Sequence, residues 1–225
     1  MKLQTLVFDW DGTLHDTAAL YGGALRETLK WLASQGYSVP VEQSDASLSR
    51  YLGVNARDMW RDFMPELPDD VKEECSWRTG ENMVCRVRSG HAEMYGGAEE
   101  CLRRFKADGY HLAILSNCKV PYMAAQREAF GLDRYFEEYY CSGAYDFQPK
   151  EEIFPYIRDR FPGEYCMIGD RASDRTAARE NGVLFVGCRY GFGTEEELAG
   201  SDAYADSAAD LCRAVAGAEQ HIIHK

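Results

Sequence analysis

Three short apolar runs constrain the fold of this chain, because each of them ends abruptly in polar residues. The runs cover residues 6–8, 112–115 and 166–168, and they are followed by Asp9, Ser116 and Gly169-Asp170. Runs this short and this apolar are typical of buried strands in a parallel sheet. Open α/β sheets bind ligands beyond the carboxyl ends of their strands. The sequence therefore predicts one sheet edge at which carboxylates and a hydroxyl gather.

The order of the expected elements favours an α/β fold with an inserted helical block. Strands are expected at residues 3–9, 110–115, 139–141, 165–169, 183–187 and 203–205, and after the first of them they alternate with helices at 98–107, 120–130, 151–160, 173–180 and 207–216. This alternation implies a parallel sheet with helices on both faces. Residues 16–90 show a helical pattern that is too long for a crossover connection. We therefore predict a Rossmann-like core of residues 1–15 and 91–225, with an α-helical cap of residues 16–90.

Inside the predicted cap, the first helix is expected to begin at Asp16 as its N-cap and to end at Gly36. A long helix is expected at residues 69–88, with shorter pieces near 43–52 and 55–63. The aromatic side chains of Trp60, Phe63 and Trp77 are expected to form the cap core rather than a stacking platform for nucleobases.

Charge and composition limit the partners of the chain. Its 225 residues carry a formal net charge of −12, which argues against duplex nucleic acid or an anionic membrane as the main partner. There is no run of about 20 apolar residues that could span a membrane and no apolar core of a secretory signal. We therefore expect a cytoplasmic protein, either a monomer or a homodimer. A phosphorylated metabolite stays compatible, because a metal ion can reverse the local field.

Asp9 and Asp11 suggest phosphoryl transfer. Two carboxylates spaced i, i+2 after a strand can face one small volume if the chain turns, and Gly12 allows such a turn. One carboxylate could attack phosphorus, and the other could serve as general acid and then as base. Bound Mg²⁺ would offset the repulsion between the first carboxylate and the phosphate. Taken alone, a polar turn explains the pair equally well.

Three motifs together resemble the haloacid dehalogenase-like superfamily of phosphatases, over nearly the whole chain. The first motif is Asp-Trp-Asp-Gly-Thr at residues 9–13, the second is Ser116-Asn117, and the fourth spans Gly169-Asp170 to Asp174. The helical block between the first and second motifs is similar to that of the subgroup with an α-helical cap, which includes phosphoglycolate phosphatase-like members.

This resemblance implies a role for each motif residue. Asp9 would be the nucleophile and Asp11 the general acid and base. Asp9, the backbone carbonyl of Asp11, and Asp170 would hold Mg²⁺, while Asp174 would orient that shell. Ser116 and N–H groups near Asn117 would bind phosphate oxygens, next to a helix N-terminus that favours anions. Without the resemblance, Ser116 is equally explained as a helix-start residue, and Asp170 and Asp174 as caps of the following helix.

The third motif departs from the common pattern of the family. Many members place a Lys where this chain has Gln148, whereas others place it closer to the following acidic residue, and Lys150 matches that spacing. We predict that Lys150 neutralises Asp9 and the phosphate. The alternative is that Lys119 or Arg171 supplies this charge and that Lys150 is solvated.

Two further segments resemble parts of phosphoglycolate phosphatase-like members. The loop Arg-Tyr-Gly-Phe-Gly at residues 189–193 is expected to bring backbone close to the cap or to the metal site. Arg50 and Asn55 lie where such members carry a specificity loop, and they are predicted to contact the non-phosphate part of the substrate. His15 is not called for by the family chemistry.

The sequence therefore predicts a Mg²⁺-dependent phosphatase that hydrolyses a small phosphorylated metabolite, phosphoglycolate-like or a sugar phosphate, through an aspartyl-phosphate. A phosphomutase or a pyrophosphatase of the same family stays possible. A non-catalytic binding protein that keeps the fold is the hypothesis from another class.

Overall fold

The computed structural model describes residues 2–223 except 45–46, 49–50, 53 and 55. Its centre is a parallel sheet of six strands in the order β3-β2-β1-β4-β5-β6. The strands are β1 (Leu3–Phe8), β2 (His111–Ser116), β3 (Glu138–Cys141), β4 (Glu164–Gly169), β5 (Leu184–Cys188) and β6 (Ala203–Ala205). Phe8 pairs with Ile114 of β2 and with Ile168 of β4, so the carboxyl ends of these three strands lie level.

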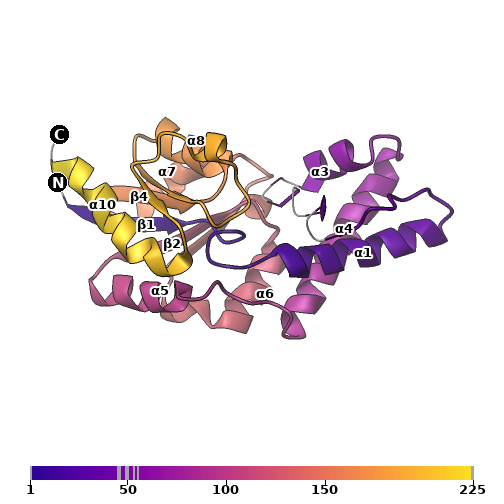
Figure 1. The fold of residues 1–225 in the computed structure, drawn as a ribbon, viewed down its shortest axis with the longest axis horizontal. Coiled ribbons are helices and arrows are strands. Elements are labelled where there is room, and N and C mark those ends of the chain that lie inside the picture. The colour runs from indigo at the N-terminus through magenta and orange to yellow at the C-terminus, as the bar shows by residue number, and fades with distance from the viewer. Residues whose placement is uncertain (1, 45–46, 49–50, 53, 55, 224–225) are drawn as a thin grey trace.

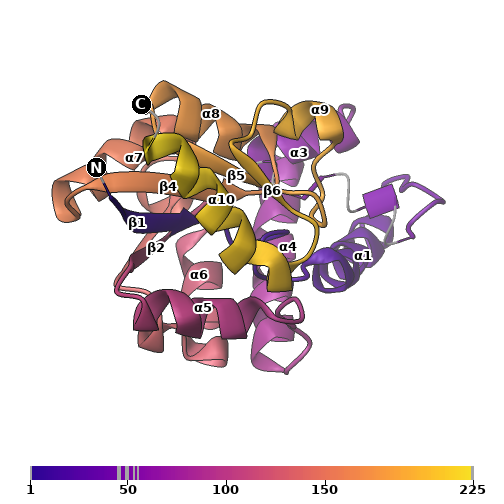
Figure 2. The same cartoon turned by 60° about the vertical axis from the view of Figure 1, so that its left-hand side comes forward.

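Helices cover both faces of the sheet (Figures 1 and 2). The helices of this part are α5 (Ala98–Ala107), α6 (Val120–Phe130), α7 (Lys150–Arg160), α8 (Ala172–Glu180), the short α9 (Glu195–Leu198) and α10 (Leu211–Ile223). Successive residues of a strand point to opposite faces. Accordingly, Phe8 packs in the cluster that includes α5, α6 and α10, whereas Val7 packs with α7 and α8. The predicted three-layer α/β core is confirmed.

The described helices between β1 and α5 form a separate layer beside the sheet edge. They are α1 (Ala18–Ser34), α3 (Ala56–Phe63) and α4 (Asp69–Arg88), and Figure 1 shows them gathered at one end of the molecule. They share a hydrophobic cluster of their own, to which Leu25, Leu29 and Trp60 contribute. We call this group of helices, with its connecting loops, the helical lobe.

Two backbone segments that run side by side join the helical lobe to the sheet. The Tyr95 N–H donates to the Leu14 carbonyl (3.0 Å), and the Asp16 N–H donates to the Glu93 carbonyl (2.9 Å). Both connections therefore cross between the two parts at one place.

Some local predictions were wrong. Thr17, not Asp16, is the N-cap residue of α1, and its side chain makes no capping hydrogen bond. Trp60 is buried and Phe63 packs against the lobe cluster as expected, but Trp77 is 55% exposed. The helix expected at residues 207–216 is α10, which begins at Leu211 and continues to Ile223. The short α9 was not predicted, because four residues carry too little periodicity.

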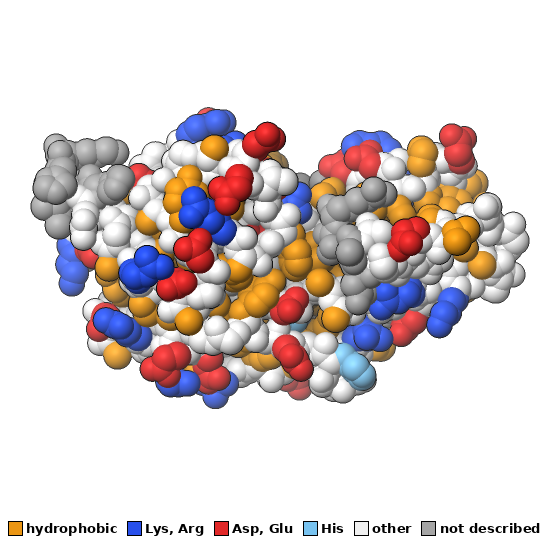
Figure 3. Space-filling model, in the orientation of Figure 1, with side chains coloured by type: hydrophobic (Ala, Val, Ile, Leu, Met, Phe, Trp, Pro, Cys, Tyr) orange, Lys and Arg blue, Asp and Glu red, His pale blue; other side chains and the backbone are white. Residues whose placement is uncertain are grey.

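Surface charge is mixed. Figure 3 shows acidic and basic side chains interspersed over the visible face. Within the residues that the structure describes, no helix combines the length and the apolar character that a membrane span needs.

Candidate active site

The site begins where β1 ends. The buried strand delivers Asp9, whose N–H still donates to the Ile168 carbonyl of β4 (2.9 Å). The chain then turns at Gly12, whose φ of +83° lies in the left-handed region that glycine tolerates. This turn leaves Asp9 and Asp11 lining the same cavity.

Lys150 lies at the start of α7 and reaches the end of β1. Its Nζ is 2.8 Å from Asp9 Oδ1 and 2.6 Å from Asp174 Oδ1, and the side chain is 1% exposed. Burial works to lower the pKa of Lys150, but the Asp174 and Asp9 carboxylates outweigh it and the pKa is raised. Lys150 is therefore a permanent cation between two carboxylates.

Three buried carboxylates form an acidic cluster around this cation. Asp9, Asp170 and Asp174 each place an oxygen within 4.8 Å of the others. Burial raises the pKa of Asp9 well above its ordinary value, against the Lys150 charge, and Asp174 and Asp170 raise it further. Burial and the neighbouring Asp174 likewise raise the pKa of Asp170 to about 7.

The acidic cluster fits a divalent metal ion. When all three carboxylates are ionised, they face one ammonium and leave two negative charges uncompensated in a buried place, which is why the pKa values of Asp9 and Asp170 are raised. Carboxylate oxygens are the ligands that Mg²⁺ prefers, and a divalent cation would balance the charge. The donor set, its burial and its charge thus agree with the metal site that the sequence predicts.

Backbone packs closely around Asp170, as predicted for the 189–193 loop. The Phe192 N–H donates to Asp170 Oδ2 (2.7 Å), and Thr13 Oγ1 donates to Asp170 Oδ1 (3.1 Å). A Cβ atom at Gly12, Gly191 or Gly193 would overlap Asp170. These glycines therefore permit the close approach that fixes the carboxylate.

The polar residues after β2 lie at the same edge. Ser116 is the last residue of β2, and its Oγ accepts a hydrogen bond from the Cys118 N–H (3.3 Å). Ser116 is not the N-cap of α6, since that position is Lys119. Asn117 also lines the cavity. The Ser116 hydroxyl keeps its proton to donate, and α6 points its N-terminus at this edge.

Asp11 has partners that sequence reasoning missed. Its Oδ1 atom accepts from Thr17 Oγ1 (2.7 Å) and from Tyr122 Oη (2.8 Å), and His15 Nδ1 lies 3.3 Å away. Burial and the Asp11 charge raise the pKa of Tyr122 well above its ordinary value, so its hydroxyl stays a donor. No sequence signal places Tyr122 here, because 111 residues separate it from Asp11.

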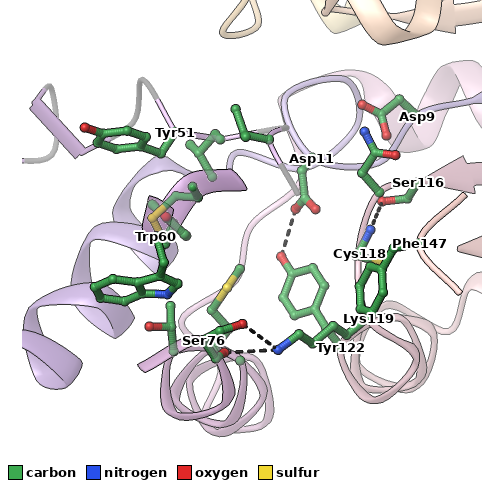
Figure 4. Close-up of a pocket in the computed structure, with 18 residues that line it drawn as sticks. Asp9, Asp11, Tyr51, Trp60, Ser76, Ser116, Cys118, Lys119, Tyr122 and Phe147 are labelled. Atoms are coloured by element: carbon green, nitrogen blue, oxygen red, sulfur yellow. Dashed lines mark hydrogen bonds between the residues drawn. The ribbon is translucent and has the colours of Figure 1, made fainter. Parts of the chain in front are cut away.

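The cavity lies between the sheet edge and the helical lobe (Figure 4). Its core side includes Asp9, Asp11, Ser116, Lys119 and Tyr122, and its lobe side includes Tyr21, Tyr51, Met59, Trp60, Ser76 and Met83. Helix α4 of the lobe packs against α6, and two core side chains donate hydrogen bonds to the lobe side. Lys119 Nζ donates to the Ser76 carbonyl (3.1 Å) and to Ser76 Oγ (3.0 Å), and Arg171 Nη1 donates to the Leu52 carbonyl.

These contacts show which basic side chain lies beside Asp9. Arg171 also pairs with Glu197 (3.3 Å), and Lys119 points to Ser76, so among the described cations Lys150 is the one that pairs with Asp9. Asp174 Oδ2 accepts from the Arg171 N–H at the start of α8 (2.9 Å), and it therefore stabilises the helix start as well. Arg50 and Asn55 lie outside the described residues.

The profile of the haloacid dehalogenase-like hydrolase family matches residues 3–182. The chain belongs to this family. A 5'-nucleotidase of Pseudomonas aeruginosa is 29% identical over 205 residues, which cover 88% of each chain. A phosphoglycolate phosphatase of Haemophilus influenzae is 26% identical over 222 residues, covering 85% of this chain and 88% of that one.

Solved structures show the same fold. A predicted phosphatase from Clostridium acetobutylicum superposes with a TM-score of 0.83 at 23% identity, over 96% of this chain and 99% of that one. CbbY from Rhodobacter sphaeroides, solved in complex with phosphate, superposes with a TM-score of 0.76 at 21% identity, over 93% and 96%. The predicted resemblance to this family is confirmed, and the protein is a hydrolase of the phosphatase type.

Proposed function

We propose that this protein is a Mg²⁺-dependent phosphomonoesterase that acts through an aspartyl-phosphate on Asp9. The environment of Asp9 carries this proposal. Its Oδ1 atom accepts from the Trp10 N–H (2.8 Å) and pairs with Lys150 Nζ (2.8 Å). Among the described residues, none donates a hydrogen bond to Oδ2. One oxygen is thus fixed, and the other is available to attack phosphorus.

In the proposed reaction, Asp9 Oδ2 bonds to phosphorus as the ester P–O bond breaks. Asp11 gives a proton to the departing alcohol oxygen, and it then takes a proton from the water that hydrolyses the aspartyl-phosphate. Lys150 stays charged throughout and compensates the negative charge at Asp9.

We propose that Asp9, Asp170 and the backbone carbonyl of Asp11 hold Mg²⁺, with Asp174 orienting this shell through Lys150 and the Arg171 N–H. When bound, the ion would neutralise charge on the transferring phosphoryl group. The phosphoryl oxygens would take hydrogen bonds from the Ser116 hydroxyl and from N–H groups near Asn117, at the N-terminus of α6.

We further propose that residues 16–90 act as a cap that closes over the substrate, on a core of residues 1–15 and 91–225. The paired connections at Leu14–Tyr95 and Asp16–Glu93 support a hinge there. The contacts of Lys119 with Ser76 and of Arg171 with Leu52 support a closed arrangement. Closure would exclude water from the reacting groups.

The proposed substrate is a small phosphorylated metabolite in the cytoplasm. The names of the relatives suggest phosphoglycolate and nucleotides, and a sugar phosphate fits the same chemistry. A homodimer and a monomer are both compatible with this function.

The test is phosphate release from purified protein, with and without Mg²⁺, on a panel of phosphoglycolate, sugar phosphates, nucleoside monophosphates, pyrophosphate and p-nitrophenyl phosphate. We expect Mg²⁺-dependent release that Asp9→Asn abolishes and that Asp133→Asn, an exposed control, leaves unchanged. Release from no member by folded protein would contradict the proposal and favour a binding protein. Transfer dependent on a bisphosphate would indicate a mutase, and release from pyrophosphate alone a pyrophosphatase.

A further inference from the structure

The hydrogen bonds of Asp11 converge on one oxygen. Thr17 Oγ1 (2.7 Å), Tyr122 Oη (2.8 Å) and His15 Nδ1 (3.3 Å) all lie next to Oδ1. Among the described residues, no hydrogen bond reaches Oδ2. The three groups come from three parts of the chain, namely the turn after β1, the start of α1 and the first turn of α6. Figure 4 shows the Tyr122 hydroxyl pointing to the Asp11 carboxylate.

The directions of these hydrogen bonds follow from the chemistry of the groups. The Thr17 hydroxyl has one proton, and of its two acceptors Asp11 Oδ1 at 2.7 Å lies closer than the His15 carbonyl at 3.2 Å, so the proton points to Asp11. The 2.7 Å contact between His15 Nδ1 and Thr17 Oγ1 therefore takes its proton from His15. His15 is fully buried, lies 5.7 Å from the Trp10 ring in a stacked arrangement, and has no partner for Nε2 among the described residues. It thus fixes the Thr17 hydroxyl as a donor to Asp11.

This arrangement determines which oxygen of Asp11 can carry a proton. A protonated carboxyl group donates from one oxygen and accepts at the other. With donors gathered at Oδ1, the proton is confined to Oδ2, the oxygen without a described partner. From the proposed function, and resting on it, we infer that Tyr122 is a positioning residue that holds Asp11 so that Oδ2 presents its proton to the leaving oxygen.

Tyr122 connects Asp11 of the first motif to helix α6. It belongs to α6, whose N-terminus follows Ser116 and Asn117, and it is 4% exposed. The helix that would bind the phosphate oxygens therefore also orients the acid that would protonate the leaving group. Through α6, the groups that would bind the phosphoryl oxygens and the group that orients the proton donor belong to one helix and its N-terminal turn.

The experiment compares leaving groups. An alkoxide leaves slowly without protonation, whereas p-nitrophenolate leaves readily, and kcat/KM reports the step in which the alcohol departs. We expect Tyr122→Phe to lower the ratio of kcat/KM for ethyl phosphate to that for p-nitrophenyl phosphate by about 10-fold or more, since a general acid contributes roughly 10²–10⁴-fold. Tyr135→Phe is the matched control, because its hydroxyl donates to the Glu99 carboxylate (2.7 Å) away from the site.

Thermal melts establish that each variant is folded, and Thr17→Val serves as a second variant with the same expected change of ratio. An equal loss on both substrates in both variants, or no loss, would overturn the positioning role while leaving the phosphatase intact. Failure of the wild-type protein to release phosphate from either substrate would overturn the proposed function and this inference together.

Discussion

The two sides of the cavity differ in how their polar groups are satisfied. On the core side, Asp9, Asp170 and Lys150 are each held by at least two contacts shorter than 3.2 Å. On the lobe side, the Trp60 Nε1 and Tyr21 Oη atoms are buried and have no hydrogen-bond partner among the described residues. Charged groups held in fixed positions are suited to a single reaction. Donors without a protein partner, in an otherwise apolar lining, are able to bind polar groups of a substrate and so to distinguish one substrate from another. From this comparison we propose that the core side carries catalysis and that the lobe side selects the substrate.

The largest effect is expected at Lys150. Lys150→Met leaves Asp9 and Asp174 buried without a counter-charge, so we expect the free energy of unfolding to fall by about 3–5 kcal/mol and kcat/KM to fall by ~10³-fold or more. Lys106→Met is the control, because its ion pair with Glu137 (2.8 Å) is partly exposed and surface pairs contribute about 0–1 kcal/mol. Equal effects of both variants in denaturant melts and phosphate-release assays would remove the distinction between a fixed charge cluster and ordinary surface charge.

The next largest effect is expected from substitution of Gly12, whose backbone packs against Asp170. Gly12 has a left-handed φ, and a Cβ atom added there would also overlap Asp170. Gly36 has a similar φ of +87°, but a Cβ atom added there would meet no neighbour, so Gly36→Ala is the control for backbone strain alone. We expect Gly36→Ala to cost about 1–2 kcal/mol of stability, and Gly12→Ala to cost more and also to lower the affinity for Mg²⁺. Thermal melts and a Mg²⁺ titration of activity measure both effects. Identical behaviour of the two variants would show that the close approach at Asp170 has no role.

Metal and pH are expected to act together. The pKa of Asp170 is raised to about 7 by burial and by Asp174, above a value of about 4 in the unfolded chain. Its contribution to the stability of the metal-free protein is therefore present below about pH 4 and is lost as the pH rises to about 7. Mg²⁺ at the proposed site would replace this proton, so we expect it to raise Tm more at pH 8 than at pH 5. An Asp170→Asn variant should lose this pH dependence, and an equal Mg²⁺ effect at both pH values would contradict the metal assignment.

The smallest effects on stability are expected on the lobe side. Tyr21→Phe removes a donor that has no described partner, so the free energy of unfolding should change by less than about 1 kcal/mol. Trp60→Phe also removes ring volume from a fully buried side chain, so it is used for its effect on substrate choice alone. If these donors select the substrate, the ranking of the panel by kcat/KM should change in the variants. A uniform change over all substrates would place selection elsewhere in the cavity.

The sequence predicted the core side in more detail than the lobe side. The strands were placed to within a few residues, because short apolar runs that end in polar residues carry a strong signal. The structure brings Asp9, Lys150, Asp170 and Asp174 together at the expected edge, although their roles stay proposals. The shell around Asp11 was not predicted, because the Tyr122 contact depends on how α6 packs beside the turn after β1. Trp77 was misplaced because hydrophobicity alone does not tell which face of a helix is buried.

The central claim is that Asp9 carries the phosphoryl group during turnover. Its most direct test is acid quenching of the enzyme a few milliseconds after mixing with Mg²⁺ and a good substrate, followed by mass spectrometry of the intact protein and its peptides. We predict a hydroxylamine-labile phosphoryl group on the peptide that contains Asp9, absent from Asp9→Asn. Phosphate release with neither a burst of alcohol nor a phosphoryl group on Asp9 would contradict the account, because it would mean that water attacks the substrate directly.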